Sequence, residues 1–178
     1  MSTATSRLGA ALCATVLLAA PPLPAAGGPP TGAPRGAHNE KLVGNWRLVS
    51  FTWKVLATGS TYEGFGTGAS GFLTYGRDGR VLVLVVGKGR PKPADWSRVT
   101  PEQSLELLKT VIAFGGTYEF DGKTVTIQVD MSSNETWTGM RLVRTLTLDG
   151  NRLTLSTPPT MGADGNEGIA VTTFERSE

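Results

Sequence analysis

From Lys41 onward, apolar and polar residues alternate in short runs that are interrupted by glycine, proline, aspartate and asparagine. A period of two residues, bounded by turn residues, indicates strands with one buried face and one solvated face. Eight runs fit this pattern. They predict strands at residues 44–53, 70–75, 80–86, 113–120, 123–131, 137–148, 152–157 and 168–176.

Three of the connections between these strands contain an Asp-Gly pair, namely Asp78-Gly79, Asp121-Gly122 and Asp149-Gly150. Tight hairpin turns need positive φ angles, which glycine adopts freely and aspartate tolerates. The pairs therefore predict an up-and-down order of antiparallel strands. Closure into a barrel removes the exposed edges of such a meander, and eight strands enclose packed side chains or one small ligand. We expect an all-β, eight-stranded antiparallel barrel, with a β-sandwich as the alternative.

One segment has a helical period instead. Thr100 offers an N-cap hydroxyl, Pro101 suits the first helical position, and Gln103 can complete a capping box. We therefore predict one short α-helix between the third and fourth strands, with its apolar side against the sheet or across one mouth of the barrel. Its apolar stripe consists of Leu105, Leu107, Leu108, Val111 and Ile112.

The N-terminal region reads as a targeting segment. Arg7 precedes an uncharged apolar run from Leu8 to Ala20, which is typical of a signal peptide and too short to span a bilayer. We assign residues 1–26 to the signal peptide, 27–40 to a flexible Gly/Pro-rich linker and 41–178 to the barrel domain. The predicted location is periplasmic or extracellular, with no stable membrane insertion after cleavage.

Composition narrows the chemistry. Cys13 lies in the leader and His38 in the linker, and the sequence holds no second residue of either kind. We therefore predict no disulfide, no metal site, no cofactor and no cysteine or histidine catalyst. Without Arg7, 16 basic residues remain against 15 acidic ones, a net charge of +1. This balance argues against a nucleic-acid partner.

Several sequence blocks follow one another along the chain, among them LVGNWRLVS at 42–50, GFLTY at 71–75, Gly116-Thr117-Tyr118, Trp137-Thr138-Gly139 and Phe174-Glu175-Arg176. In their order and spacing these blocks resemble the bacterial lipocalin-like domain family across nearly all of residues 41–176. The resemblance implies a β-barrel with a pocket, although a fold alone does not assign an activity. The chain departs from the pattern at Ile127-Gln128, where a histidine pair is expected, so no acid-base role of that pair carries over.

Arg144 is a charged residue on an apolar face, because alternation along the sixth predicted strand places it with Met140, Leu142, Leu146 and Leu148. A guanidinium in such a place needs a partner. One hypothesis is that it binds the carboxylate of a ligand inside the barrel. The alternatives are an arginine that closes the barrel end, or an ion pair with Glu63, Glu119 or Glu175.

Aromatic and apolar residues near Arg144 in the predicted fold are candidate ligand contacts, or alternatively core residues that fill the interior. Trp46 and Arg176 belong to the first and last strands, which closure brings together, and we interpret them as a structural plug in which the cation covers the ring. The candidate ligand-binding residues are Arg144, Tyr75, Phe114, Tyr118, Trp137, Met140 and Leu142.

The sequence therefore favours an exported lipocalin-like protein that binds a small hydrophobic ligand. The absence of a recognisable catalytic motif disfavours an enzyme, but two alternatives stay open. One is an isomerase or cyclase that confines a hydrophobic substrate and uses Arg144, Tyr118 or Glu119. The other is an envelope structural protein. For this second reading, the strand at 80–86 is apolar on both faces, and the helix or the second subunit of a homodimer would cover its outer side.

Overall fold

The computed structural model of the protein describes residues 40–162 and 165–177. The predicted signal peptide (1–26) and residues 27–39 of the predicted linker, with Cys13 and His38, lie outside the described residues. In the described part, the strands are β1 (Gly44–Val55), β2 (Thr61–Glu63), β3 (Ser70–Tyr75), β4 (Arg80–Val86), β5 (Val111–Phe120), β6 (Thr124–Ser132), β7 (Arg141–Asp149), β8 (Arg152–Ser156), β9 (Thr160–Met161) and β10 (Glu167–Arg176).

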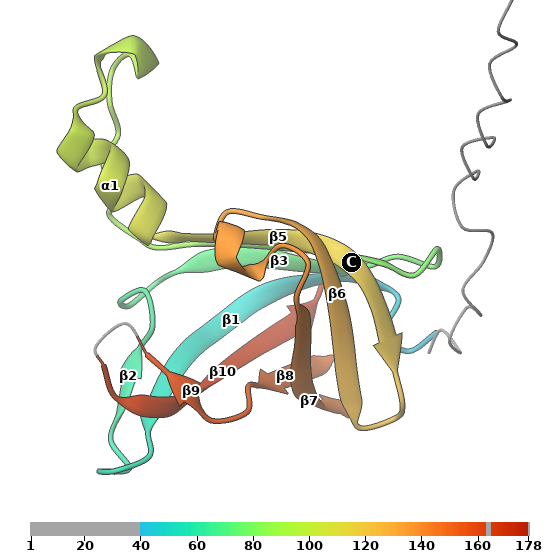
Figure 1. The fold of residues 1–178 in the computed structure, drawn as a ribbon. Helices are drawn as coiled ribbons and strands as arrows, with labels where there is room; N and C mark the ends of the chain where they lie inside the picture. The colour runs from blue at the N-terminus through green and yellow to red at the C-terminus, as the bar shows by residue number, and fades with distance from the viewer. Residues whose placement is uncertain (1–39, 163–164, 178) are drawn as a thin grey trace, which may run out of the picture. The chain divides into compact units, whose positions relative to one another are not determined.

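These strands form one antiparallel sheet in the order β2-β1-β3-β4-β5-β6-β7-β8-β10-β9 (Figure 1). Strand β1 also pairs with β10, and this pairing closes eight strands into a barrel. The short strands β2 and β9 pair antiparallel with β1 and β10, respectively, and are not part of the closed ring of eight strands. The predicted eight-stranded up-and-down barrel is therefore confirmed. The sandwich alternative is wrong, because the first long strand, β1, is hydrogen-bonded to the last, β10, and the sheet closes on itself.

Strands β3 and β4 begin and end at the predicted residues, whereas the predicted strand at 137–148 starts late. Strand β7 begins at Arg141, and Trp137 lies in the short 3-10 helix η2 (Glu135–Trp137). Two local features cause this delay. The Asn134 side chain accepts a hydrogen bond from the Thr136 amide, and Gly139 adopts a φ of 82°, so the chain turns before it can extend.

Helix α1 (Pro101–Lys109) has the predicted capping box. The Gln103 amide donates to the Thr100 hydroxyl at 3.3 Å, and the Thr100 amide donates to the Gln103 side chain at 3.1 Å. The helix lies after β4, between β4 and β5, and not between the third and fourth strands. The third strand predicted from the sequence, at residues 80–86, is the fourth strand of the structure because β2 was not predicted. Strand β2 has three residues, all exposed, so its sequence carries no burial signal.

Helix α1 does not pack against the sheet, contrary to the prediction. It projects from the barrel (Figure 1), it contains no buried residue, and Leu105 and Leu108 are 50% and 57% exposed. The expected last residue of its stripe, Ile112, belongs to β5. The outer residues of β4, Leu82 and Leu84, are exposed as well, so the helix does not cover them.

The helix is fixed at its C-terminal end only. The Gly87 amide, just after β4, donates to the Thr110 carbonyl at 2.9 Å. The Arg90 guanidinium donates to the Leu107 carbonyl at 3.0 Å and to the Thr110 hydroxyl at 3.1 Å. Because these bonds satisfy carbonyl groups of the last turn, the helix can extend into solvent without leaving its C-terminus unpaired.

The core fills the barrel interior, and in several strands alternation selects its residues. In β4, Val81, Val83 and Val85 point inward and are buried, while the residues between them are exposed. The same period holds in β3, β6 and β8, so in these strands the hydrophobic pattern itself sets which face becomes the interior. The side chains with less than 2% exposure are Trp46, Tyr75, Phe174, Leu42, Leu73, Ile127, Leu153, Val125 and Val129.

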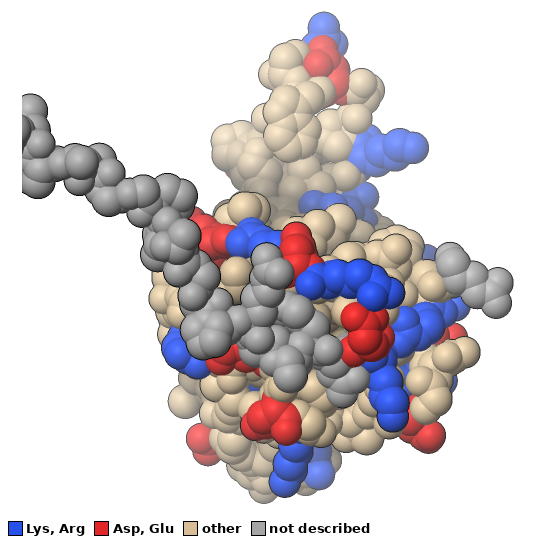
Figure 2. Space-filling view, turned by 90° about the vertical axis from the view of Figure 1, so that its right-hand side faces the viewer, with Lys and Arg blue, Asp and Glu red and all other residues tan. Residues whose placement is uncertain are grey.

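Charges lie on the outer surface, where basic and acidic side chains are interspersed on the face shown in Figure 2. Some of them pair across neighbouring strands: Glu175 lies 3.7 Å from Arg47 and 3.0 Å from Arg152. Such exposed pairs add little stability each. Within residues 40–162 and 165–177, no helix has the length and apolar character needed to cross a bilayer.

Candidate functional site

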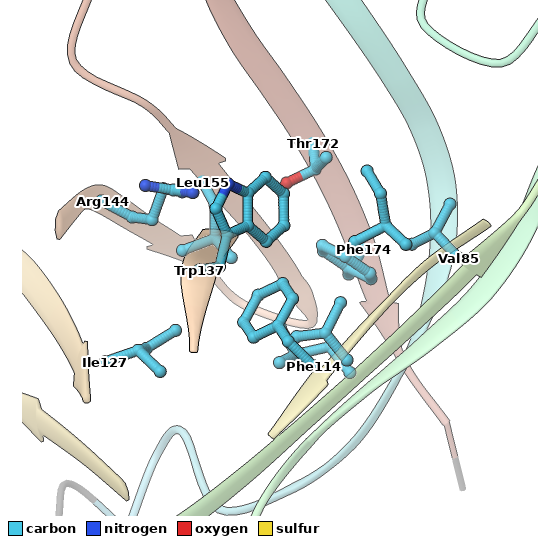
Figure 3. A pocket seen from close by; sticks show the side chains of 11 residues that line it. Val85, Phe114, Ile127, Trp137, Arg144, Leu155, Thr172 and Phe174 are labelled. Atoms are coloured by element: carbon cyan, nitrogen blue, oxygen red, sulfur yellow. The ribbon is translucent and has the colours of Figure 1, made fainter. Parts of the chain in front are cut away.

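The barrel interior contains a small cavity between the inward faces of the strands. It offers about 80 Å³ to the centres of water-sized molecules. Its wall is almost entirely apolar, and its aromatic part consists of Phe114, Trp137 and Phe174. The rings of Phe114 and Trp137 meet edge to face, with centroids 5.7 Å apart (Figure 3). The full lining is Leu73, Val83, Val85, Ile112, Phe114, Ile127, Trp137, Arg144, Leu155, Thr172 and Phe174.

Arg144 brings the only ionisable group into this wall among the described residues. It lies on the inward face of β7 between the buried Leu142 and Leu146, as alternation predicted, and its own side chain is partly buried. Its Nη1 atom donates to the carbonyl of Val143 at 2.8 Å. Burial lowers the pKa of the guanidinium, because desolvation disfavours its charged form.

The carboxylates proposed as partners of Arg144 lie elsewhere. Glu119 faces outward and approaches Arg141 at 3.9 Å, Glu175 pairs with the outer arginines of neighbouring strands, and Glu63 is exposed on β2. Within the described parts of the chain, no carboxylate lies within ion-pair distance of Arg144. The ion-pair alternative is therefore wrong, and the guanidinium retains donors that a ligand can use.

Two predicted tyrosines lie side by side next to the cavity but do not line it. The rings of Tyr75 and Tyr118 are 4.6 Å apart. The Tyr118 hydroxyl donates to the Gly76 carbonyl at 3.2 Å, whereas the buried Tyr75 hydroxyl has no hydrogen-bond partner in the described structure. Burial raises the pKa of the Tyr75 hydroxyl, and the Arg144 guanidinium acts in the opposite direction with a smaller effect.

Trp46 and Arg176 meet as the sequence predicted. The guanidinium carbon of Arg176 lies 4.1 Å from the centroid of the Trp46 ring, and its nitrogens donate to the carbonyls of Lys41 and Val43. The Trp46 indole donates to the Leu42 carbonyl at 2.8 Å. Neither residue lines the cavity, and their contacts join the first strand to the last.

Of the predicted ligand contacts, the structure brings Arg144, Phe114 and Trp137 together in one wall. Leu142 is buried in the core beside this wall, whereas Met140 precedes β7 and is 50% exposed, so it cannot contact a ligand in the cavity. The turn that delays β7 is the reason. Most of the lining was not predicted from the sequence to contact a ligand, although alternation gives its inward direction. The lining residues missed are Leu73, Val83, Val85, Ile112, Ile127, Leu155, Thr172 and Phe174.

The groups named for an isomerase or cyclase do not converge. Glu119 is on the outer surface, the Tyr118 hydroxyl is engaged by a backbone carbonyl, and Ile127 fills the wall where a histidine was expected. No cluster of three metal-ligating side chains occurs in the described residues. The arrangement is suited to holding an apolar molecule and one anionic group.

The buried Tyr75 makes stability sensitive to alkaline pH. Burial raises the pKa of its hydroxyl, so above about pH 10 the unfolded chain releases a proton that the folded chain retains. This contribution to stability is present below pH 10 and is lost as the pH rises further. We expect the free energy of unfolding, measured in urea between pH 9 and 11, to fall, and to fall less steeply in Tyr75→Phe. An identical slope in the variant would contradict the assignment.

Comparison with known protein families identifies residues 43–177 as a lipocalin-like domain. The match covers every strand of the closed barrel and all residues that line the cavity. A search among curated proteins finds no match. The chemistry of the site therefore has to be argued from its own residues.

Proposed function

Because the chain belongs to the lipocalin-like domain family, we propose that its barrel binds a small hydrophobic molecule with an acidic group, which Arg144 anchors. The observation that carries this proposal is a guanidinium in the wall of an apolar cavity, with no carboxylate of residues 40–162 and 165–177 within ion-pair distance. A buried charge without a counter-ion is costly, and a bound anion would supply that counter-ion. The forked donors of arginine match a carboxylate.

The size of the cavity limits the ligand. One water molecule needs roughly 10–15 Å³ of the volume that is open to the centres of water-sized molecules. The 80 Å³ of this cavity is therefore space for about five to eight waters. A compact molecule fits this space, whereas a long acyl chain would require the lining to move apart. The Phe114 and Trp137 rings offer the apolar body of such a molecule a flat contact surface.

We further propose that the protein works outside the cytoplasm. The support is the sequence of the leader, in which Arg7 precedes the apolar run from Leu8 to Ala20. The barrel is then a binding protein of the periplasm or the extracellular medium.

The test replaces Arg144 with methionine, which keeps much of the side-chain volume and removes the charge. We expect Arg144→Met to weaken the binding of compact apolar monocarboxylates, such as isovalerate and benzoate, by about tenfold or more, because a charged hydrogen bond contributes about 1.5–3 kcal/mol. We also expect the free energy of unfolding to rise by about 1 kcal/mol, since a desolvated cation is removed. Titration calorimetry and urea unfolding measure the two effects.

Arg141 provides the matched control. It lies in the same strand, faces outward and has a side chain that is 65% exposed. Arg141→Met should change neither carboxylate affinity nor stability by a measurable amount. Equal affinities of the wild type and Arg144→Met for every acid, or no binding of any acid to the wild type, would overturn the anchoring role.

A further inference from the structure

The Tyr75 hydroxyl is a buried polar group that the described structure leaves without a partner. The residue is 1% exposed, and no acceptor lies within hydrogen-bond distance of its hydroxyl. An unsatisfied buried group of this kind destabilises a fold, so its presence requires an explanation. The neighbouring Tyr118, whose ring is 4.6 Å away, shows that a partner is attainable here, since its own hydroxyl donates to the Gly76 carbonyl.

The position of Tyr75 connects it to the cavity. It follows Leu73 on the inward face of β3, and Leu73 lines the cavity. Its cross-strand partner in β4 is Val81, which precedes the lining residue Val83 on the same face. Tyr75 therefore occupies the layer directly next to the cavity. Its hydroxyl is not part of the lining, so a ligand reaches it only when the lining side chains between them move.

The Tyr75 hydroxyl and the Arg144 guanidinium both have hydrogen-bond donors available for a further acceptor. The guanidinium can only donate, and the hydroxyl keeps its proton because burial raises its pKa. Both groups therefore call for an acceptor, and neither finds a carboxylate among the described residues. A single carboxylate has two oxygens, which can accept from the two groups at once.

We propose that the Tyr75 hydroxyl and the Arg144 guanidinium together bind the carboxylate of a compact aromatic monocarboxylic acid of about the size of benzoate, whose ring contacts Phe114 and Trp137. This inference rests on the proposed function and adds the second donor and the class of the ligand. The ring follows from the paired aromatic side chains and the small volume. The single carboxylate follows from the two unmatched donors.

The test measures the affinity of the full-length protein for benzoate and for benzyl alcohol, a neutral molecule of the same size. We expect the wild type to prefer benzoate by at least about tenfold. Tyr75→Phe should weaken benzoate binding by about tenfold, the effect of one charge-assisted hydrogen bond, and leave benzyl alcohol within about twofold. A loss of packing alone would weaken the binding of both ligands equally. A change in the ratio of the two affinities therefore shows that the hydroxyl itself binds the carboxylate.

Tyr118→Phe is the matched control, because it removes a neighbouring hydroxyl that already has a backbone acceptor. Its ratio of benzoate to benzyl alcohol affinity should equal that of the wild type. If Tyr75→Phe keeps the wild-type ratio while Arg144→Met loses it, the Tyr75 hydroxyl binds a bridging water only, and this inference is overturned while the proposed function stands. If the wild type binds neither molecule, both are overturned.

A crystal structure of the wild type with benzoate tests the same contact without any substitution, and so covers a variant that fails to fold. The expected result is one carboxylate oxygen about 2.7 Å from the Tyr75 hydroxyl and the other bound to Arg144. A carboxylate directed away from Tyr75 would overturn the inference.

Discussion

Replacing Trp46 with alanine is expected to lower the free energy of unfolding by about 3 to 5 kcal/mol, the usual range for removing a large buried aromatic side chain. Trp46 is completely buried. Its removal leaves a cavity, takes the ring from under the Arg176 guanidinium, and deprives the buried Leu42 of the donor to its carbonyl. Three losses at one site make this a severely destabilising truncation.

The effect should extend to ligand binding, because Trp46 and Arg176 join the strands whose pairing closes the barrel. We expect Trp46→Ala to weaken benzoate binding as well. Urea unfolding followed by circular dichroism measures the stability, and Trp96→Ala is the control, since Trp96 is 82% exposed. A loss below about 1 kcal/mol in Trp46→Ala would show that the closed end of the barrel is not built as described.

The second large effect is expected at Gly116, where two strands approach too closely for any side chain. A Cβ atom added there would lie 2.0 Å from the Gln128 carbonyl oxygen of β6. The pairing of β5 with β6 shifts register between Gly115 and Gly116, so that Asp130 is the extra residue of a bulge. Because the obstacle is backbone, it cannot move aside without breaking the ladder. Gly116→Ala should therefore cost about 3 kcal/mol, at the upper end for overpacking.

The preceding residue is a strict control. A Cβ atom at Gly115 would lie 3.4 Å from its nearest neighbour, the Val81 carbonyl oxygen, which is an ordinary contact. We expect Gly115→Ala to change the free energy of unfolding by less than about 0.5 kcal/mol. Equal effects of the two substitutions would mean that the close approach at the bulge does not exist.

Alternation and turn chemistry were enough to predict the barrel. Strands β3 and β4 lie where the two-residue period placed them, and the Asp-Gly pairs lie at hairpins between consecutive strands. The capping box of α1 was also readable, because every group in it comes from four consecutive residues, Thr100 to Gln103. These features depend on residues close together in the sequence, and local physics is enough to predict them.

Part of the candidate site was readable in the same way. Alternation in β7 placed Arg144 on the inward face, and strand order made Trp46 and Arg176 neighbours. Alternation could not show that Met140 is exposed, because the turn at Gly139 interrupts the two-residue period. Nor could it say which inward side chains meet at one height in the barrel, since that depends on the stagger between strands.

Three facts came only from the tertiary structure. Helix α1 projects into solvent although its stripe predicts a buried face, because bonds to Thr110 and Leu107 fix its C-terminal end alone. Arg144 forms no ion pair with a carboxylate of the described residues, because Glu119 and Glu175 point outward. Tyr75 keeps a buried hydroxyl that has no hydrogen-bond partner among the described residues. Sequence by itself determined which residues face inward, but only the closed barrel decided which of them meet, since these contacts join residues far apart in the chain.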